Sequence, residues 1–210
     1  MSLPYDPGDA LRTLRRADAT LGALIDRIGP FRLERRPPYD PFQALARSII
    51  YQQLSGKAAA TIHGRVLDLF PDAGHPTPQQ LLDAPDDVLR SAGVSRNKVA
   101  ALKDLAAKTL DGVVPPMADL EALDDHAVIE RLTQVRGVGR WTAEMVLLFY
   151  MGRPDVLPAT DLGVQKGFML TYDLDALPTP KALTTHGERW RPYRSVAAWY
   201  LWRAVDSREG

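Results

Sequence analysis

Two glycines, Gly137 and Gly139, interrupt a part of the chain that otherwise has helical character. Inside a helix each glycine would cost about 1 kcal/mol relative to alanine, so the pattern favours a break at this point. A short helix capped by Asp124 or Asp125 precedes the break, and a second helix is expected to begin near Arg140. Two helices joined by so short a turn must lie side by side or cross at a steep angle, so the sequence predicts a helical hairpin.

Most of the remaining chain also shows apolar residues at helical spacing. We expect helices over about 8–28, 41–54 and 192–204, and helix starts at the capping residues Ser55, Thr77, Ser95 and Thr179. The 17 prolines fall mostly between these segments, and no segment shows sustained apolar and polar alternation. The sequence therefore predicts an all-α protein.

Proline-rich turns near residues 37–38 and 152–154 suggest where the chain divides. We expect a central helical lobe over 38–152 that contains the hairpin. A second helical lobe would be formed by both termini, from 1–37 plus 153–210, with a cleft between the two lobes.

Composition excludes several kinds of site. The chain has no cysteine, so it has no disulfide, no cysteine-ligated iron–sulfur cluster and no cysteine nucleophile. Its four scattered histidines show no spacing typical of a metal site, so we expect no metal held by side chains. No apolar run is long enough to span a bilayer, and residues 1–9 do not resemble a secretory signal, which predicts a cytoplasmic protein.

The net charge is zero, which by itself argues mildly against a partner rich in phosphate. Arginines are nevertheless concentrated in two segments, 31–38 and 186–195. Either segment could simply be a solvated basic face, and composition alone does not decide between the two interpretations.

The glycine turn has two interpretations. A glycine that merely caps a helix end would explain it without any function. Alternatively, Gly137 and Gly139 leave bare backbone amides at the start of the second helix, which is a geometry that binds phosphate. Val138 would then point into the space between the helices. The second helix, from Trp141 to Met151, is apolar nearly all round, which indicates that it is buried.

A carboxylate follows the hairpin in the stretch "DVLPATDLGVQKGF", residues 155–168. Asp161 stands at the start of a probable helix, and on its own it would be interpreted as a helix N-cap. Taken together, the hairpin, the apolar helix, the Gly-x-Pro turn and the Pro-x-x-Asp sequence are much more specific.

This combination resembles the helix-hairpin-helix/Gly-Pro-Asp superfamily of base-excision DNA glycosylases. The stretches "FQALARSIIYQQLSGKAAATI" (42–62) and "SAGVSRNKVAALKDLA" (91–106) look like two of its characteristic blocks. The stretch "RWRPYRSVAAWYLWR" (189–203) looks like the C-terminal block of the 3-methyladenine DNA glycosylase II branch. The chain resembles a compact form of that branch, without the N-terminal β-rich domain of the full-length bacterial enzyme.

The resemblance implies that Asp161 is the catalytic carboxylate. Cleavage of an N-glycosidic bond builds positive charge on the sugar, and a fixed carboxylate stabilises that charge and can orient the attacking water. The hairpin would bind the DNA backbone without reading sequence, through Gly137, Val138, Gly139 and Thr142. Its carbonyl oxygens, from Val135, Val138 or neighbours, could hold a monovalent cation, and we expect no other cofactor.

Relatives that also cleave the DNA backbone carry a lysine two residues after the second glycine, and this chain has Trp141 there. The resemblance therefore implies a monofunctional glycosylase that leaves an abasic site. The target base must leave the stack, and an aromatic pocket would bind a cationic alkylated base. Trp141, Trp202, Tyr51 and Met145 are the pocket candidates, with Trp199 as a further one. Tyr51 and Trp199 could equally be core or lobe-interface aromatics, and Met145 is more typical of core packing. Gln53 or Leu54 could fill the gap in the duplex, or be an ordinary loop or core residue.

The main hypothesis is thus a monomeric enzyme that removes alkylated bases such as 3-methyladenine and 7-methylguanine from double-stranded DNA. One alternative is a hairpin module that binds DNA without catalysis, for which a carboxylate near phosphate would serve no purpose. The other is a glycosylase for another lesion, such as uracil or a mismatched base.

Overall fold

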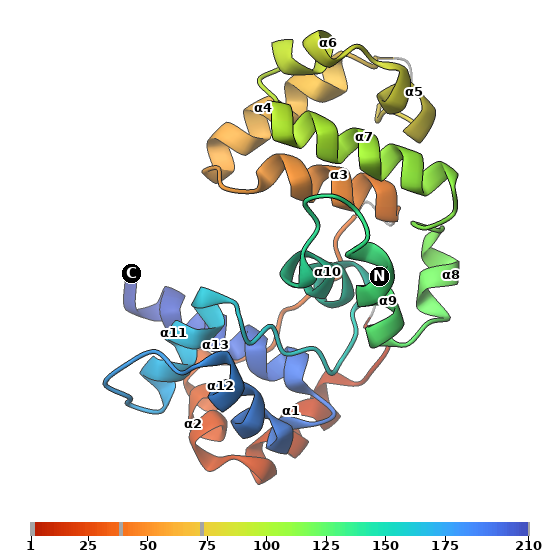
Figure 1. Cartoon of the computed structure of the whole chain (residues 1–210). Helices are drawn as coiled ribbons and strands as arrows, with labels where there is room; N and C mark the ends of the chain where they lie inside the picture. The colour runs from red at the N-terminus through yellow and green to blue at the C-terminus, as the bar shows by residue number, and fades with distance from the viewer. Residues whose placement is uncertain (1–2, 38–39, 72–73, 210) are drawn as a thin grey trace. The chain divides into compact units, whose positions relative to one another are not determined.

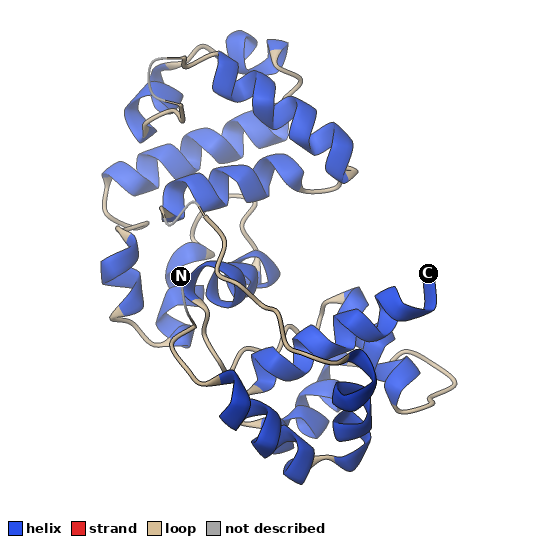
Figure 2. Cartoon of the chain, turned by 180° about the vertical axis from the view of Figure 1, so that it is seen from behind, coloured by secondary structure: helices blue, strands red, loops and turns tan. Residues whose placement is uncertain are grey.

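The computed structural model describes residues 3–37, 40–71 and 74–209. Within these residues the regular structure is entirely helical, which confirms the all-α prediction (Figures 1 and 2). The helices are α1 (Pro7–Ala17), α2 (Ala19–Ile28), α3 (Pro41–Tyr51), α4 (Gly56–Asp68), α5 (Pro78–Asp83), α6 (Asp86–Ser91), α7 (Arg96–Leu110), α8 (Met117–Glu121), α9 (Asp125–Leu132), α10 (Arg140–Val146), the π-helix η1 (Leu147–Met151), α11 (Leu162–Thr171), α12 (Pro180–Gly187), the 3₁₀-helix η2 (Glu188–Trp190) and α13 (Arg194–Glu209).

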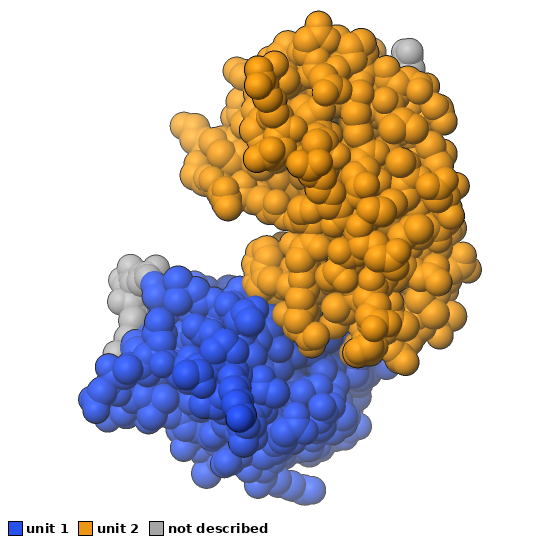
Figure 3. Space-filling view, in the orientation of Figure 1, with its two compact units in different colours: residues 1–35, 147–210 blue, residues 36–146 orange. Residues whose placement is uncertain are grey.

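The chain divides into two compact units (Figure 3). Unit 1 consists of residues 1–35 and 147–210, and unit 2 of residues 36–146. The second boundary falls where α10 continues into η1, not at the turn over 152–154 that the sequence favoured. The π-helix belongs to unit 1 because Phe149 stacks on Trp202 and the Tyr150 carbonyl oxygen accepts a hydrogen bond from Arg35.

Unit 1 is built around the pair α11 and α13. Gly167 makes their close approach possible, because a Cβ atom at that position would lie 1.9 Å from the carbonyl oxygen of Leu201. Its buried core draws residues from both ends of the chain: Ala10, Leu14, Leu21, Leu24, Ile25, Ala159, Val164, Phe168, Leu183, Trp190, Val196, Ala197, Ala198, Tyr200, Leu201 and Ala204. Burial of this apolar surface is the main favourable contribution to the stability of the unit.

Unit 2 packs α3 against α4, α7 and α10, with α5 also against α7. Ile49, Leu102 and Leu105 are among its buried side chains. The predicted helix starts in this unit are confirmed: Ser55 and Ser95 accept amide hydrogen bonds as N-caps, and Thr77 forms a capping box with Gln80. In unit 1, Thr179 caps α12 as predicted.

The prediction of one continuous helix over 8–28 is wrong. The chain leaves helical geometry at Asp18, whose φ is −152°, so α1 ends at Ala17 and α2 begins at Ala19. The Asp18 side chain accepts from the amide of Leu21 and so favours a new helix start over a continuation. Apolar spacing does not reveal the break because both helices bury a stripe in the same core.

Two smaller differences concern short elements. The helix expected over 41–54 ends at Tyr51, so Leu54 lies in a loop. The helices α6 and α8, of six and five residues, are too short for apolar periodicity to show. Across the described residues, no helix has the length and apolar character needed to cross a membrane, and no group of three or more acidic or histidine side chains is placed to hold a metal.

Candidate active site

The glycine turn joins α9 and α10 in unit 2 as a helical hairpin. Gly137 has φ of 77°, a left-handed conformation that glycine adopts without steric cost. The Val138 side chain is buried, as predicted, and its amide donates to the carbonyl oxygen of Val135 at 3.0 Å. Gly137 and Gly139 are exposed, so their backbone faces solvent.

Helix α7 holds the start of this turn in place. The carboxylate of Asp104 accepts from the amide of Arg136 at 2.7 Å, and Lys108 donates to the carbonyl oxygen of Gln134. Burial opposes ionisation of Asp104, but the hydrogen bonds from Arg136 and Lys108 and their charges outweigh it, so the pKa of Asp104 lies below its usual value. An ionised Asp104 therefore anchors the hairpin.

The loop between α3 and α4 is tied to the same turn. Gln52 donates from Nε2 to the carbonyl oxygen of Gly137 at 2.9 Å, and Lys98 donates to the carbonyl oxygens of Ile50 and Gln52 at 2.7 Å each. Burial lowers the pKa of Lys98. Unit 2 thus brings the hairpin and this loop together through contacts that the sequence did not predict.

Gln53 and Leu54, the two wedge candidates, both lie on this loop. Gln53 is exposed and has φ of 56°, a conformation that costs a non-glycine residue about 1 kcal/mol or more. Leu54 is a large apolar side chain that is 39% exposed. Neither residue is part of the core of unit 2.

Trp141 on α10 is 44% exposed, whereas Met145, one turn later, is half-buried. Thr142, which we expect to contact the DNA backbone, is only 4% exposed, and this contact stays a prediction. The same helix buries Glu144, whose carboxylate accepts from Nε of the exposed Arg140 at 2.8 Å.

Tyr51 has a different environment from that expected of a base pocket. The guanidinium of Arg47 lies 3.9 Å from the centre of the Tyr51 ring, and the ring of His63 lies edge-on at 6.1 Å. Because a cation already occupies one face of the ring, a cationic base would be repelled there. The structure therefore favours the alternative that Tyr51 is a packing residue.

The predicted cation would lie against the hairpin carbonyl oxygens. The Val135 carbonyl accepts from Val138, the Gly137 carbonyl from Gln52 and the Gln134 carbonyl from the ammonium of Lys108. A carbonyl oxygen has two lone pairs, so the Val135 oxygen can take a further ligand. The cation stays a prediction.

In unit 1, Asp161 caps α11. Its Oδ1 accepts from the amide of Val164 at 2.9 Å and from the indole nitrogen Nε1 of Trp202 at 2.8 Å. The N-cap that the sequence predicted is confirmed, and the structure adds Trp202 as a second donor. Two hydrogen bonds to one oxygen hold the carboxylate in a single orientation.

Gly163 and Phe149 complete the surroundings of Trp202. A Cβ atom at Gly163 would lie 2.8 Å from Cδ1 of Trp202 and 3.1 Å from Oδ1 of Asp161, so only glycine leaves room for the indole. The ring of Phe149 stacks on Trp202 at 5.7 Å between centroids. Phe149 lies on the π-helix, an irregularity that often occurs at functional sites.

Sequence reasoning missed Gly163, Phe149 and Gln52. The glycines at 163 and 167 are one helical turn apart, and that spacing is a signal of close packing that could have been used. No comparable signal existed for Gln52, since its partner lies 85 residues away in the chain.

The chain is similar to proteins of a known family. The model of the HhH-GPD superfamily of base excision DNA repair proteins matches residues 46–192. DNA-3-methyladenine glycosylase 1 of Schizosaccharomyces pombe is 37% identical over 181 residues, which cover 86% of this chain and 79% of that protein.

Two solved structures are also similar. The 3-methyladenine DNA glycosylase of Schizosaccharomyces pombe, in complex with abasic DNA, aligns with a TM-score of 0.84 and 36% identity, covering 93% of this chain and 95% of that one. The DNA-3-methyladenine glycosidase of Bacillus halodurans aligns with a TM-score of 0.87 and 36% identity, covering 99% and 93%. Because the family model and these relatives match most of its length, the chain belongs to the HhH-GPD superfamily of base excision DNA repair proteins.

Proposed function

We propose that this protein is a monofunctional DNA glycosylase that excises alkylated bases, of the 3-methyladenine and 7-methylguanine type, from double-stranded DNA. The observation that carries the proposal is the Asp161 carboxylate, held at the start of α11 by Val164 and Trp202. A carboxylate fixed in this way, in a chain of a base excision repair family, has the chemistry that cleavage of an N-glycosidic bond requires.

The reaction breaks the bond between the sugar C1′ and the base nitrogen, and the bonding electrons leave with the base. Asp161 stabilises the positive charge that develops on the sugar. Water then adds to C1′ and gives up a proton, for which the carboxylate is the acceptor, leaving an abasic site. A base alkylated on a ring nitrogen is cationic before cleavage and leaves as a neutral molecule, so it needs no strong general acid.

Binding of DNA would use unit 2. The exposed backbone of Gly137 and Gly139 contacts a phosphate, while Gln53 or Leu54 enters the duplex where the target base has been flipped out. The strained backbone of Gln53 and the exposed apolar side chain of Leu54 support this assignment. Trp141 and Trp202 are the aromatic candidates for contact with the flipped base.

The choice of alkylated bases draws on the relatives. The two solved structures and the similar protein of Schizosaccharomyces pombe are named for 3-methyladenine. The aromatic candidates Trp141 and Trp202 suit an electron-poor, cationic base.

The monofunctional assignment rests on Trp141. It stands two residues after Gly139, where an amine nucleophile would be needed to form a Schiff base with the sugar. Treatment of the reacting protein with borohydride should therefore trap no covalent complex with DNA, and a trapped complex would overturn this part of the proposal.

The central experiment measures base release from DNA that carries alkylated, deaminated or oxidised bases. We expect the wild type to release 3-methyladenine or 7-methylguanine preferentially. Asp161→Asn should bind the same DNA but release these bases at least about a hundredfold more slowly, because it removes the charge that stabilises the transition state. Asp173→Asn, which alters an exposed residue beyond the end of α11, is the matched control and should retain activity. Full activity of Asp161→Asn would refute the catalytic role.

We further propose that the protein acts as a monomer and that the hairpin carbonyls bind a monovalent cation. Sedimentation of the free protein tests the first statement. For the second, DNA affinity should be higher in potassium chloride than in a tetraalkylammonium salt of equal ionic strength, and equal affinities would contradict it.

A further inference from the structure

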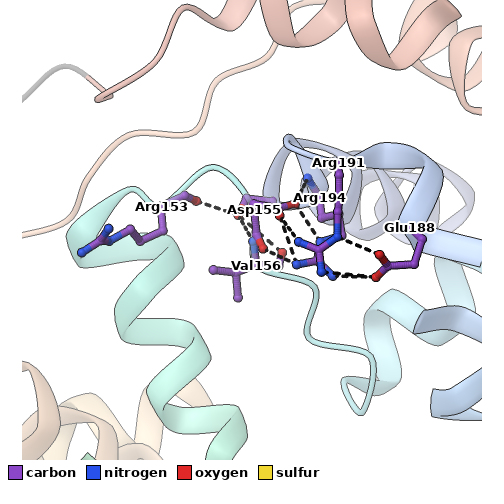
Figure 4. A network of polar contacts seen from close by, with 7 residues as sticks. Arg153, Asp155, Val156, Glu188, Arg191 and Arg194 are labelled. Carbon is purple, nitrogen blue, oxygen red and sulfur yellow. Dashed lines mark hydrogen bonds and ion pairs between the residues drawn. The ribbon is translucent and has the colours of Figure 1, made fainter. Parts of the chain in front are cut away.

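The segment that leads from η1 to Asp161 has no regular secondary structure. It runs over residues 152–160, and a loop of this kind has no helical hydrogen bonds to set its path. The start of α13 supplies fixed contacts instead, through Arg194 (Figure 4) and through Ser195.

Arg194 binds the Asp155 carboxylate through two nitrogens. Its Nε lies 2.7 Å from Oδ1 and its NH2 group 3.1 Å from Oδ2, and the same NH2 group donates to the Asp155 carbonyl oxygen at 2.9 Å. The side chain of Arg194 is only 14% exposed and that of Asp155 only 20%. A two-pronged contact of this kind fixes direction as well as distance, which a single point charge does not.

The neighbours of this pair complete the arrangement. Arg191 also donates to Asp155, and Glu188 accepts from Arg191 at 2.8 Å and from Arg194 at 3.2 Å. The two arginines are therefore held by a carboxylate on each side. Figure 4 shows these side chains directed toward one another.

Ser195 forms hydrogen bonds with the backbone of the same loop, residues 152–160. It is fully buried, its Oγ accepts from the amide of Val156 at 2.9 Å, and it donates to the carbonyl oxygen of Arg153 at 2.6 Å. Its own amide donates to the carbonyl oxygen of Pro154 at 2.9 Å. The loop is thus bound to α13 by backbone groups as well as by side chains.

These contacts join the two elements that carry the candidate active site. Asp161 follows the fastened loop, and Trp202 lies on α13 about two helical turns after Arg194. The hydrogen bond between Trp202 and Asp161, at 2.8 Å, tolerates little relative displacement of the two elements. Further along, Gly167 against Leu201 holds α11 on α13.

We propose that Asp155, Arg194 and Ser195 form a clamp whose role is to position the Asp161 carboxylate against the indole N–H of Trp202. These three are positioning residues, because they act on the reaction only through Asp161. The inference rests on the proposed glycosylase function for its kinetic consequence, but its geometric consequence holds in the absence of DNA.

The test variant is Arg194→Lys, which keeps the positive charge and loses the two-pronged contact. Arg203→Lys is the matched control, since Arg203 lies on the same helix and pairs with Asp206 instead of with the loop. If Arg194→Lys does not fold, Asp155→Asn is the second variant that tests whether the clamp positions Asp161.

The first measurement is the NMR signal of the Trp202 indole N–H in the DNA-free protein, assigned by its disappearance in Trp202→Phe. We expect this signal to move in Arg194→Lys toward the position of an indole without a carboxylate partner, and to stay unchanged in Arg203→Lys. An unchanged signal in folded Arg194→Lys and Asp155→Asn would overturn the clamp.

The second measurement separates positioning from stability. At a temperature where each variant is fully folded, Arg194→Lys should lower the single-turnover rate of base release about tenfold, equivalent to about 1.4 kcal/mol. Its affinity for DNA with an abasic site should stay within about twofold of the wild type. An unchanged rate, or a loss explained wholly by weaker binding, would contradict a positioning role. A wild type that releases no base would refute the proposed function, while the indole signal would still decide whether the clamp exists.

Discussion

At the scale of single residues, the candidate site depends on the lack of a side chain at Gly163. Gly163 leaves space for the indole of Trp202, which donates to Oδ1 of Asp161. The sequence predicted Asp161 as a helix cap from its residue type, and the resemblance to a glycosylase family made Asp161 and Trp202 candidates for the site. It did not predict the bond between them, since that bond depends on how two helices approach each other in three dimensions.

Replacing Gly163 tests this dependence. In Gly163→Ala the new Cβ atom would lie 2.8 Å from a rigid indole ring, so the ring must turn away and lose its bond to Asp161. A hydrogen bond to a charged group contributes about 1.5–3 kcal/mol, so base release should slow by about tenfold or more in single-turnover assays. Gly64→Ala is the control, because Gly64 is helical and a Cβ atom there would meet nothing within 4 Å. Equal rates for the two variants would show that the indole bond does not matter.

At the scale of elements, Asp18 links the junction of α1 and α2 to side chains at the end of α11, in α12 and in η2. One carboxylate oxygen accepts from Tyr172 at 2.6 Å, Trp190 at 2.9 Å and His186 at 3.0 Å. The residue is only 6% exposed. Burial opposes ionisation, but the hydrogen bonds from these side chains and from the amide of Leu21 outweigh it, so the pKa of Asp18 lies below its usual value of 3.8.

This arrangement predicts a specific loss of stability. A carboxylate with a lowered pKa stabilises the folded state fully above about pH 4, and that contribution is lost as the pH falls through the folded-state pKa. Asp18→Asn should lower the free energy of unfolding by about 2 kcal/mol or more at pH 7, measured by urea denaturation, and the difference from the wild type should shrink in acid. Asp26→Asn, on the exposed end of α2 and paired with Arg15, should change little at either pH. An Asp18 variant as stable as the wild type at pH 7 would contradict this account.

The elements also show which features a sequence reveals. Caps such as Thr77 and Ser95 and the glycine turn at Gly137 are local, so residue type and spacing were enough to predict them. The break at Asp18 was missed because its cap bond to Leu21 leaves the apolar spacing unchanged, and because its other partners, Tyr172 and Trp190, lie far along the chain. The clamp on the loop before Asp161 was missed for the same reason, since no local pattern distinguishes a buried arginine from a solvated one.

At the scale of the whole molecule, the two units differ in how the chain builds them. Unit 2 is one continuous segment, whereas unit 1 combines residues 1–35 with residues 147–210. The first segment contributes Leu14, Leu21 and Ile25 to the buried core that supports α11 and α13. Unit 1 should therefore depend on a segment remote in sequence from Asp161.

A chain that begins at residue 36 tests this dependence. Without α1 and α2, the apolar faces of α11 and α13 that pack on Leu21 and Ile25 become exposed, and burial of each such side chain contributes about 1.5–3 kcal/mol. Hydrogen exchange followed by mass spectrometry should show that amides over 162–204 lose protection, while those of α3 and α7 retain it because their own core is intact. Adding a peptide of residues 3–35 in excess should restore protection to unit 1, since it supplies the missing core without a covalent link. Full protection over 162–204 in the shortened chain without the peptide would mean that α11 and α13 hold the Asp161 carboxylate unaided.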